Sequence, residues 1–192
     1  MIKHICTIAV LTAGIAFAQN DPASARINNE VRHQLAMLPN YGVFDNLQFR
    51  LDGNVITLLG QASRPTLKRD AERALKGVEG VTTINNKIEV LPLSPNDDRI
   101  RAAVYTRLYR TPSLQKYTSN RTEPILRNSL ANRISITNDP PIGYHAIHII
   151  VKNGHVTLEG AVAAGSDRDI ASIKTNTVSG VFLVTNNLRV DG

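Results

Sequence analysis

Residues 151–160 read VKNGHVTLEG, and residues 51–60 read LDGNVITLLG. When the sequence is aligned with itself, residues 47–90 match residues 147–190 without a gap. Identical pairs include Thr57 with Thr157, Leu58 with Leu158, and Gly60 with Gly160. A repeat at a fixed offset indicates two copies of one structural unit, so the chain is expected to fold as two related modules.

The repeated segment begins with a predicted β-hairpin. Apolar residues alternate with polar ones before each turn, at Leu47, Phe49 and Leu51 in the first copy and at Ile147, Ile149 and Val151 in the second. This period of two gives each strand one apolar face. The turns Asp52-Gly53-Asn54 and Asn153-Gly154 contain residues that tolerate positive φ, which tight hairpins require. The second strands are expected to run over 55–60 and 155–160.

Helices are predicted before and after each hairpin. Asp21-Pro22 and Ser94-Pro95 are typical helix starts, followed by apolar residues at helical spacing. Ser63 with Pro65, and Ser166 with Asp169, are expected to cap the second helix of each copy. That helix should end near Gly80 or Gly180, and a third strand should follow over 82–90 or 182–190.

The order helix, strand, strand, helix, strand therefore occurs twice. We expect an α+β protein of two αββαβ modules, each a small three-stranded sheet with two helices on one face. The first module is expected to span 19–92 and the second 93–192, with an insertion at about 110–144 that has no counterpart in the first copy. Modules of this size are marginally stable alone, so the two are expected to pack together.

The first 18 residues have the pattern of a secretory signal peptide. Lys3 and His4 precede a short apolar run, and Ala16-Phe17-Ala18 provides small residues at the expected cleavage positions. The apolar run is too short for a bilayer-spanning helix, which needs about 20 residues. Cleavage near Ala18 would remove Cys6, the only cysteine, and leave a periplasmic or secreted protein without disulfides or thiol chemistry.

The two copies resemble the BON (bacterial OsmY and nodulation) domain. The shared pattern is a hairpin ending V-x-L-x-G, a helix, and a G-V-x-x-V-x-N segment that enters the last strand. The second copy matches at Val156, Leu158 and Gly160 and again in 180–186, whereas Ile56 replaces the valine in the first copy. The resemblance implies an exported αββαβ module, often found in tandem, that contacts phospholipid membranes or other envelope components. It implies no catalytic residues.

Positive charge is concentrated in the middle of the chain. The net charge of the whole chain is +6, and residues 99–133 contain eight basic residues against the single acid Glu123. Interleaved tyrosines suit a water–lipid interface, and each basic residue near an anionic leaflet contributes on the order of 1 kcal/mol. The predicted lipid-binding residues are Arg99, Arg101, Tyr105, Arg107, Tyr109, Arg110, Lys116, Arg121, Arg127 and Arg133.

The sequence is compatible with two interpretations of the insertion. A short helix from Pro124, with Leu126, Leu130 and Ile134 on one side, would lie on anionic lipid with its arginines facing the headgroups. Alternatively, the apolar side packs on the module and the arginines are a solvated surface. A protein- or glycan-binding adaptor of the cell envelope, without direct lipid contact, is the competing function.

Other chemistry lacks support in the sequence. No metal, cofactor or catalytic group is predicted, because His145 and His148 should point to opposite sides of an extended chain, and His148 is expected to be a surface residue. Asn86 and Asn186 are expected to be buried amides bonded to backbone. The glycines at 60, 80, 160 and 180 are interpreted as structural. Export argues against a nucleic acid partner; an anionic membrane surface, an envelope component or a protein partner remain.

Overall fold

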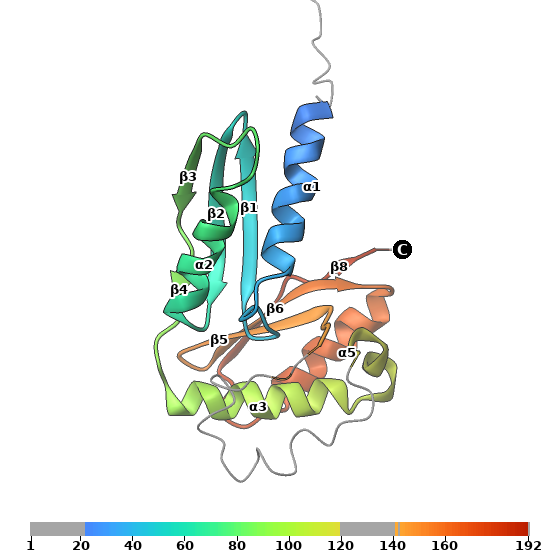
Figure 1. Ribbon diagram of the computed structural model, residues 1–192. Coiled ribbons are helices and arrows are strands. Elements are labelled where there is room, and N and C mark those ends of the chain that lie inside the picture. Colours follow the sequence, from blue (N-terminus) through green and yellow to red (C-terminus); the bar gives the residue numbers. More distant parts are fainter. Residues whose placement is uncertain (1–21, 120–140, 142, 192) are drawn as a thin grey trace, which may run out of the picture.

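The computed structural model of the protein describes residues 22–119, 141 and 143–191. Module 1 contains α1 (Pro22–Ala36), β1 (Asn46–Asp52), β2 (Val55–Ala62), α2 (Pro65–Leu75), β3 (Thr83–Asn86) and β4 (Glu89–Val90). Module 2 contains α3 (Pro95–Tyr109), the 3-10 helix η1 (Pro112–Tyr117), β5 (Ile147–Lys152), β6 (His155–Val162), α5 (Gly165–Asn176), β7 (Leu183–Asn186) and β8 (Arg189–Val190). Figure 1 shows the two modules, which confirm the predicted α+β fold.

Each sheet has four short strands because the predicted third strand is split in two. β1 and β2 are antiparallel, and both β3 and β4 pair in parallel with β2; module 2 repeats this arrangement. The split follows Asn86, whose Nδ2 donates to the Lys68 carbonyl of α2 at 2.8 Å and whose Oδ1 accepts from the Ile88 N–H at 3.2 Å. Asn186 makes the same two bonds in module 2. The predicted bonding to backbone is confirmed, although both asparagines are half-buried rather than buried.

The two helices of each module cover the same face of its sheet. In module 1, α1 contributes Ile27, Val31 and Leu35 to a core that also contains Leu67 and Leu75 of α2. In module 2, residues of α3 pack on the alternating apolar residues of β5 and β6. Fully burying one such side chain contributes roughly 1.5–3 kcal/mol, so these shared faces account for most of the stability of each module.

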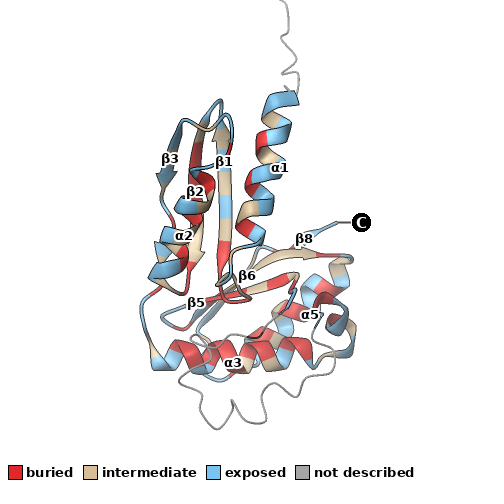
Figure 2. Cartoon of the chain, in the orientation of Figure 1, coloured by how far each residue is buried: buried red, intermediate tan, exposed pale blue. Residues whose placement is uncertain are grey.

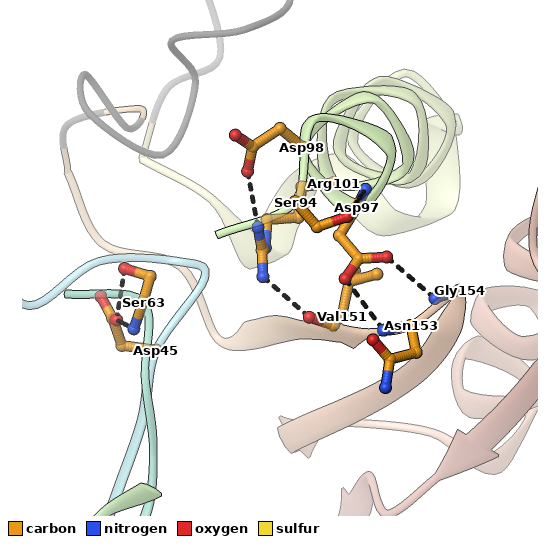
Figure 3. Close-up of polar contacts among 9 residues, drawn as sticks. All are labelled: Asp45, Ser63, Ser94, Asp97, Asp98, Arg101, Val151, Asn153 and Gly154. Atoms are coloured by element: carbon orange, nitrogen blue, oxygen red, sulfur yellow. Dashed lines mark hydrogen bonds and ion pairs between the residues drawn. The ribbon is translucent and has the colours of Figure 1, made fainter. Parts of the chain in front are cut away.

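The helix starts agree only partly with the sequence. Ser94 is the N-cap of α3, and its Oγ accepts from the Asp97 N–H at 3.2 Å. The predicted role of Ser63 is wrong, because Arg64 occupies the N-cap position of α2 without a side-chain cap. Ser63 instead donates from its N–H and its Oγ to Asp45 Oδ1, at 2.6 and 2.7 Å (Figure 3). Similarly, α5 begins at Gly165 with no side-chain cap, so Ser166 lies inside the helix.

Gly60 and Gly160 occupy equivalent positions at which the two antiparallel strands approach each other closely. Their φ angles are +99° and +119°. A Cβ on either residue would lie 2.0 Å from a backbone oxygen of the neighbouring chain segment, that of Asn46 or Ala146. A residue with a Cβ therefore cannot occupy either position unless the backbone shifts. Gly80 and Gly180, after the second helices, also have positive φ.

The loop between α1 and β1 joins the two modules. Val43 and Phe44 of this loop are each 1% exposed and belong to the hydrophobic core of module 2. The Ile149 N–H donates to the Val43 carbonyl at 2.7 Å, so this loop covers part of the outer edge of β5. An ion pair between Lys152 and Glu89 adds a contact at the surface. Module 2 thus completes its core with residues of module 1, and the two modules pack together as expected.

Candidate binding surfaces

Helix α3 carries most of the described residues that were predicted to bind lipid, and its position is fixed by a carboxylate. The side chain of Asp97 accepts from the backbone N–H groups of Asn153 and Gly154, each at 2.8 Å (Figure 3). These two residues form the β5–β6 hairpin turn and both have positive φ. The first turn of α3 is therefore bound to the hairpin beneath it.

Three of the predicted lipid-binding residues hold α3 in place instead. Arg101 is 2% exposed, pairs with Asp98 and donates to the Val151 carbonyl at 2.7 Å (Figure 3). The Tyr109 hydroxyl donates to the Ile147 carbonyl at 2.6 Å, and burial raises the pKa of that hydroxyl. Tyr105 is also buried, with its hydroxyl 3.1 Å from His145 Nε2. The predicted lipid contact is wrong for Arg101, Tyr105 and Tyr109.

A periodicity in the sequence could have revealed that these three side chains are buried. Positions 101, 105 and 109 recur every four residues, so they lie on one side of a helix, next to the apolar stripe formed by Ile100, Val104 and Leu108. Charged and aromatic residues beside that stripe are more consistent with a core-facing surface than with a solvated one. The buried residues of α3 occur along its whole length, as Figure 2 shows.

The opposite side of α3 retains a basic surface. Arg99, Arg107 and Arg110 are exposed, and positions 99, 103, 107 and 110 follow one helical stripe. Arg107, Arg110 and Lys174 of α5 line a shallow pocket of about 470 Å³ with small residues such as Ala103 and Thr106. None of the described residues that line it is acidic. We call Arg99, Arg107, Arg110 and Lys174 the α3 basic face.

Lys116 belongs to a different cluster. Its Nζ lies 2.8 Å from Asp167 Oδ2, and this contact lowers the pKa of Asp167 and raises that of Lys116. The Tyr117 hydroxyl donates to the same carboxylate at 2.7 Å and accepts from the Ala163 N–H at 2.7 Å. The charge of Lys116 is therefore largely compensated within the protein. Arg121, Arg127, Arg133, the helix predicted from Pro124 and the signal peptide lie outside the described residues.

A second candidate surface, which the sequence did not reveal, is a cleft of about 900 Å³ between the modules. The far face of the β5–β6 hairpin, opposite α3, forms one side, and the end of α1 with the start of β1 forms the other. Its polar residues include Arg32, Gln48, Glu159, Asn187 and Arg189. We call this space the inter-module cleft.

Two histidines lie beside the inter-module cleft and both are neutral at pH 7. Burial lowers the pKa of His145 to about 4 and also lowers that of His148. The ring of His148 stacks on Tyr41, with centroids 5.3 Å apart, and its Nδ1 lies 2.7 Å from the Asp45 carbonyl oxygen. The expectation that His148 is a surface residue is confirmed only in part, because its ring is half-buried against module 1 although it lines the cleft. Within the described ranges, no group of three histidine, cysteine or acidic side chains is placed to hold a metal ion.

The sequence of the chain matches a family model described as the BON domain, over residues 23–92 and again over residues 128–192. The chain belongs to the BON domain family. The two matches agree with the tandem repeat, and they leave α3 outside because the insertion separates it from the rest of module 2. BON domains are generally non-catalytic and are associated with phospholipid or envelope components.

The similarity of this BON protein to solved structures is low. No curated protein matches the chain. A structure of CdsD, a structural protein of the type III secretion system of Chlamydia trachomatis, aligns at 13% identity and a TM-score of 0.27, covering 86% of this chain and 92% of that one. The C-terminal domain of CdsD aligns at 14% identity and a TM-score of 0.25, covering 85% and 96%. Among the described helices, none combines the length and apolarity needed to cross a bilayer.

Proposed function

We propose that this protein is a non-catalytic binding protein of the cell envelope, whose module 2 contacts anionic phospholipid through the α3 basic face. The observation that carries the proposal is the pocket in which Arg107, Arg110 and Lys174 gather without an acidic lining residue. Like charges brought together in this way repel one another, and an anion between them relieves that repulsion. A phospholipid phosphate fits because guanidinium groups bind its oxygens in a bidentate geometry.

The proposed contact is peripheral. The tyrosines of α3 are buried, so the described part of this face offers charge rather than aromatic side chains that insert among acyl chains. Attachment of this kind depends on salt, because exposed charges are screened over a Debye length of about 8 Å at physiological ionic strength. Arg99 extends the surface by two helical turns from Arg107.

Co-sedimentation with vesicles tests the proposal. Vesicles of pure phosphatidylcholine are compared with vesicles that contain phosphatidylglycerol, across a series of salt concentrations. The triple variant Arg107→Gln, Arg110→Gln and Lys174→Gln should bind the anionic vesicles at least about tenfold more weakly at low salt, because each cation contributes on the order of 1 kcal/mol.

A control triple variant removes the same charge elsewhere. Arg50, Arg73 and Lys76 are exposed residues of module 1, away from α3, and their change to glutamine should leave vesicle binding within about twofold of the unmodified chain. If both triple variants bind equally, or if anionic and neutral vesicles bind equally, the α3 basic face is not a lipid site. An adaptor without lipid contact then becomes the better explanation.

A further inference from the structure

The inter-module cleft is built on the face of the second sheet that the helices of module 2 leave uncovered. Ile147, Ile149 and Val151 point toward α3, so His148 lies on the other face, and its cross-strand partner is Glu159 of β6. The lipid site proposed above and the cleft therefore lie on opposite sides of one sheet. A chain that rests on lipid through α3 turns the cleft away from the bilayer.

Three residues that module 2 contributes to the cleft differ in kind from their counterparts in module 1. Glu159 occupies the position of Leu59, His148 that of Gln48, and Arg189 that of Glu89. Both modules have the same sheet topology and register, so the fold does not require these residues. They appear in the copy whose uncovered sheet face lines the cleft, which points to a function of that surface.

Two cations of the cleft are available to a ligand. Arg32 of α1 and Arg189 of β8 are both exposed and line the cleft from opposite modules. Within the described residues, neither takes part in an ion pair. A guanidinium group binds a carboxylate through two parallel hydrogen bonds, so a ligand with carboxylate groups suits this pair.

The remaining lining suits sugar rings. Tyr144 is 71% exposed, and Phe49 lines the same cleft, so flat apolar surfaces are available for the apolar faces of sugar rings. Gln48 offers an exposed amide that both donates and accepts, as sugar hydroxyl groups do. Asn187 donates to Glu159 Oε1 at 2.8 Å, which fixes that carboxylate as an acceptor for further hydroxyl groups.

An extended peptide is less well accommodated at this position. Peptides commonly bind by adding a strand to a free sheet edge. The edge of β5 beside the cleft is already bonded, because the Ile149 N–H donates to the Val43 carbonyl at 2.7 Å. Strand addition at this edge would have to displace the loop that completes the core of module 2.

We propose that the inter-module cleft binds an oligosaccharide that carries carboxylate groups, with Arg32 and Arg189 holding the carboxylates and Tyr144 packing on a sugar ring. The cleft volume of about 900 Å³ lies within the range of about 300–1,000 Å³ that is typical of ligand sites. The cleft is separate from the lipid site, and binding of the oligosaccharide requires no membrane. A chain with both sites would connect a lipid surface to a glycan in the envelope space.

Calorimetric titration of the full chain, without vesicles, tests this proposal with two closely matched probes. One is a tetrasaccharide of alternating N-acetylglucosamine and N-acetylmuramic acid, and the other is chitotetraose, which lacks the lactyl carboxylates. The carboxylated probe should bind at least about tenfold more tightly than chitotetraose. Arg189→Gln should weaken binding of the carboxylated probe about tenfold and leave chitotetraose unchanged, as expected for the loss of a charged hydrogen-bonding partner.

The matched control is Arg50→Gln, which removes an exposed arginine from the first sheet outside the cleft and should leave both titrations unchanged. Thermal unfolding checks that Arg189→Gln folds normally, and Arg32→Gln provides a second cleft variant from the other module. Failure of the carboxylated probe to bind would overturn the proposal. Equal binding of the two tetrasaccharides, or unchanged binding in both cleft variants, would also overturn it. None of these outcomes affects the vesicle experiment, which tests the lipid site independently.

Discussion

The ring of Phe44, from the α1–β1 loop of module 1, packs edge-on against the ring of Tyr105 on α3 of module 2, with centroids 6.3 Å apart and an interplanar angle of 65°. Edge-to-face pairs of this kind contribute beyond the apolar area that they bury. Since Phe44 is 1% exposed within the core of module 2, the two modules share one hydrophobic core at this point. Their stabilities should therefore be coupled.

Phe44→Ala tests this coupling. The variant should lose about 3–5 kcal/mol of unfolding free energy, the usual cost of deleting a buried phenylalanine ring. Urea unfolding followed by far-ultraviolet circular dichroism measures the loss. The control is Phe182→Ala, which removes a phenylalanine that is 78% exposed and should change stability by less than about 0.5 kcal/mol. Similar small losses in both variants would show that the shared core is unimportant.

Asp97→Ala should loosen α3 from the β5–β6 hairpin. The change leaves the Asn153 and Gly154 N–H groups without their acceptor, at a cost of about 2–4 kcal/mol in total. Hydrogen exchange should show lost protection at the Gly154 amide before the amides of β6 are affected. Asn96→Ala, at the exposed neighbouring position, is the control and should retain that protection. If Gly154 stays equally protected in Asp97→Ala, the carboxylate does not hold α3.

Gly160→Ala should destabilise the protein by at least about 2 kcal/mol. The residue has a φ of +119°, and the added Cβ would overlap the Ala146 carbonyl oxygen at 2.0 Å, so either strand must move. Gly165→Ala is the matched control, because no atom lies within 4 Å of its added Cβ, and it should be neutral or stabilising by up to about 1 kcal/mol. Thermal unfolding of both variants compares them. A tolerated alanine at 160 would contradict the close approach of the strands.

The fold could be predicted from the sequence because the repeat and the period-two pattern reflect the local structure directly. Leu47, Phe49 and Leu51, and their counterparts one hundred positions later, place the hairpins, and Ser94 marks the start of α3. The splitting of the third strand was not predicted, because it depends on a side-chain bond from Asn86 to a carbonyl of α2. Such a long-range bond leaves no local pattern in the sequence.

The candidate sites could be predicted only in part, because they also depend on long-range contacts. Net charge identified the basic segment but could not separate Arg101, which faces β5, from Arg107 and Arg110, which face solvent. Ser63 has the pattern of a helix cap, yet it binds Asp45 across the module. The inter-module cleft could not be predicted, because it depends on how Val43 and Phe44 dock module 1 onto module 2.

The remaining prediction concerns stability in acid and depends on His145. Its Nδ1 lies 2.9 Å from the Gly143 carbonyl oxygen, which can only accept, so Nδ1 carries the proton and Nε2 accepts from Tyr105. Protonation would add a donor where an acceptor is needed and would place a charge in a buried site. Burial accordingly lowers the folded-state pKa from 6.5 to about 4. The folded state thus binds this proton less readily than the unfolded state.

Stability contributed by neutral His145 should therefore be fully present above about pH 6.5 and lost as the pH falls toward 4, by on the order of 3 kcal/mol in total. Burial raises the pKa of Asp45, so this residue contributes more stability as the pH falls. The test therefore compares proteins that all retain Asp45. Urea unfolding from pH 7 to pH 4 should show a shallower loss of stability in His145→Gln than in the unmodified chain. His33→Gln, which removes an exposed imidazole on α1, should keep the original slope. Equal slopes for all three proteins would mean that His145 is protonated in the folded state without penalty, because its site would then be open to water.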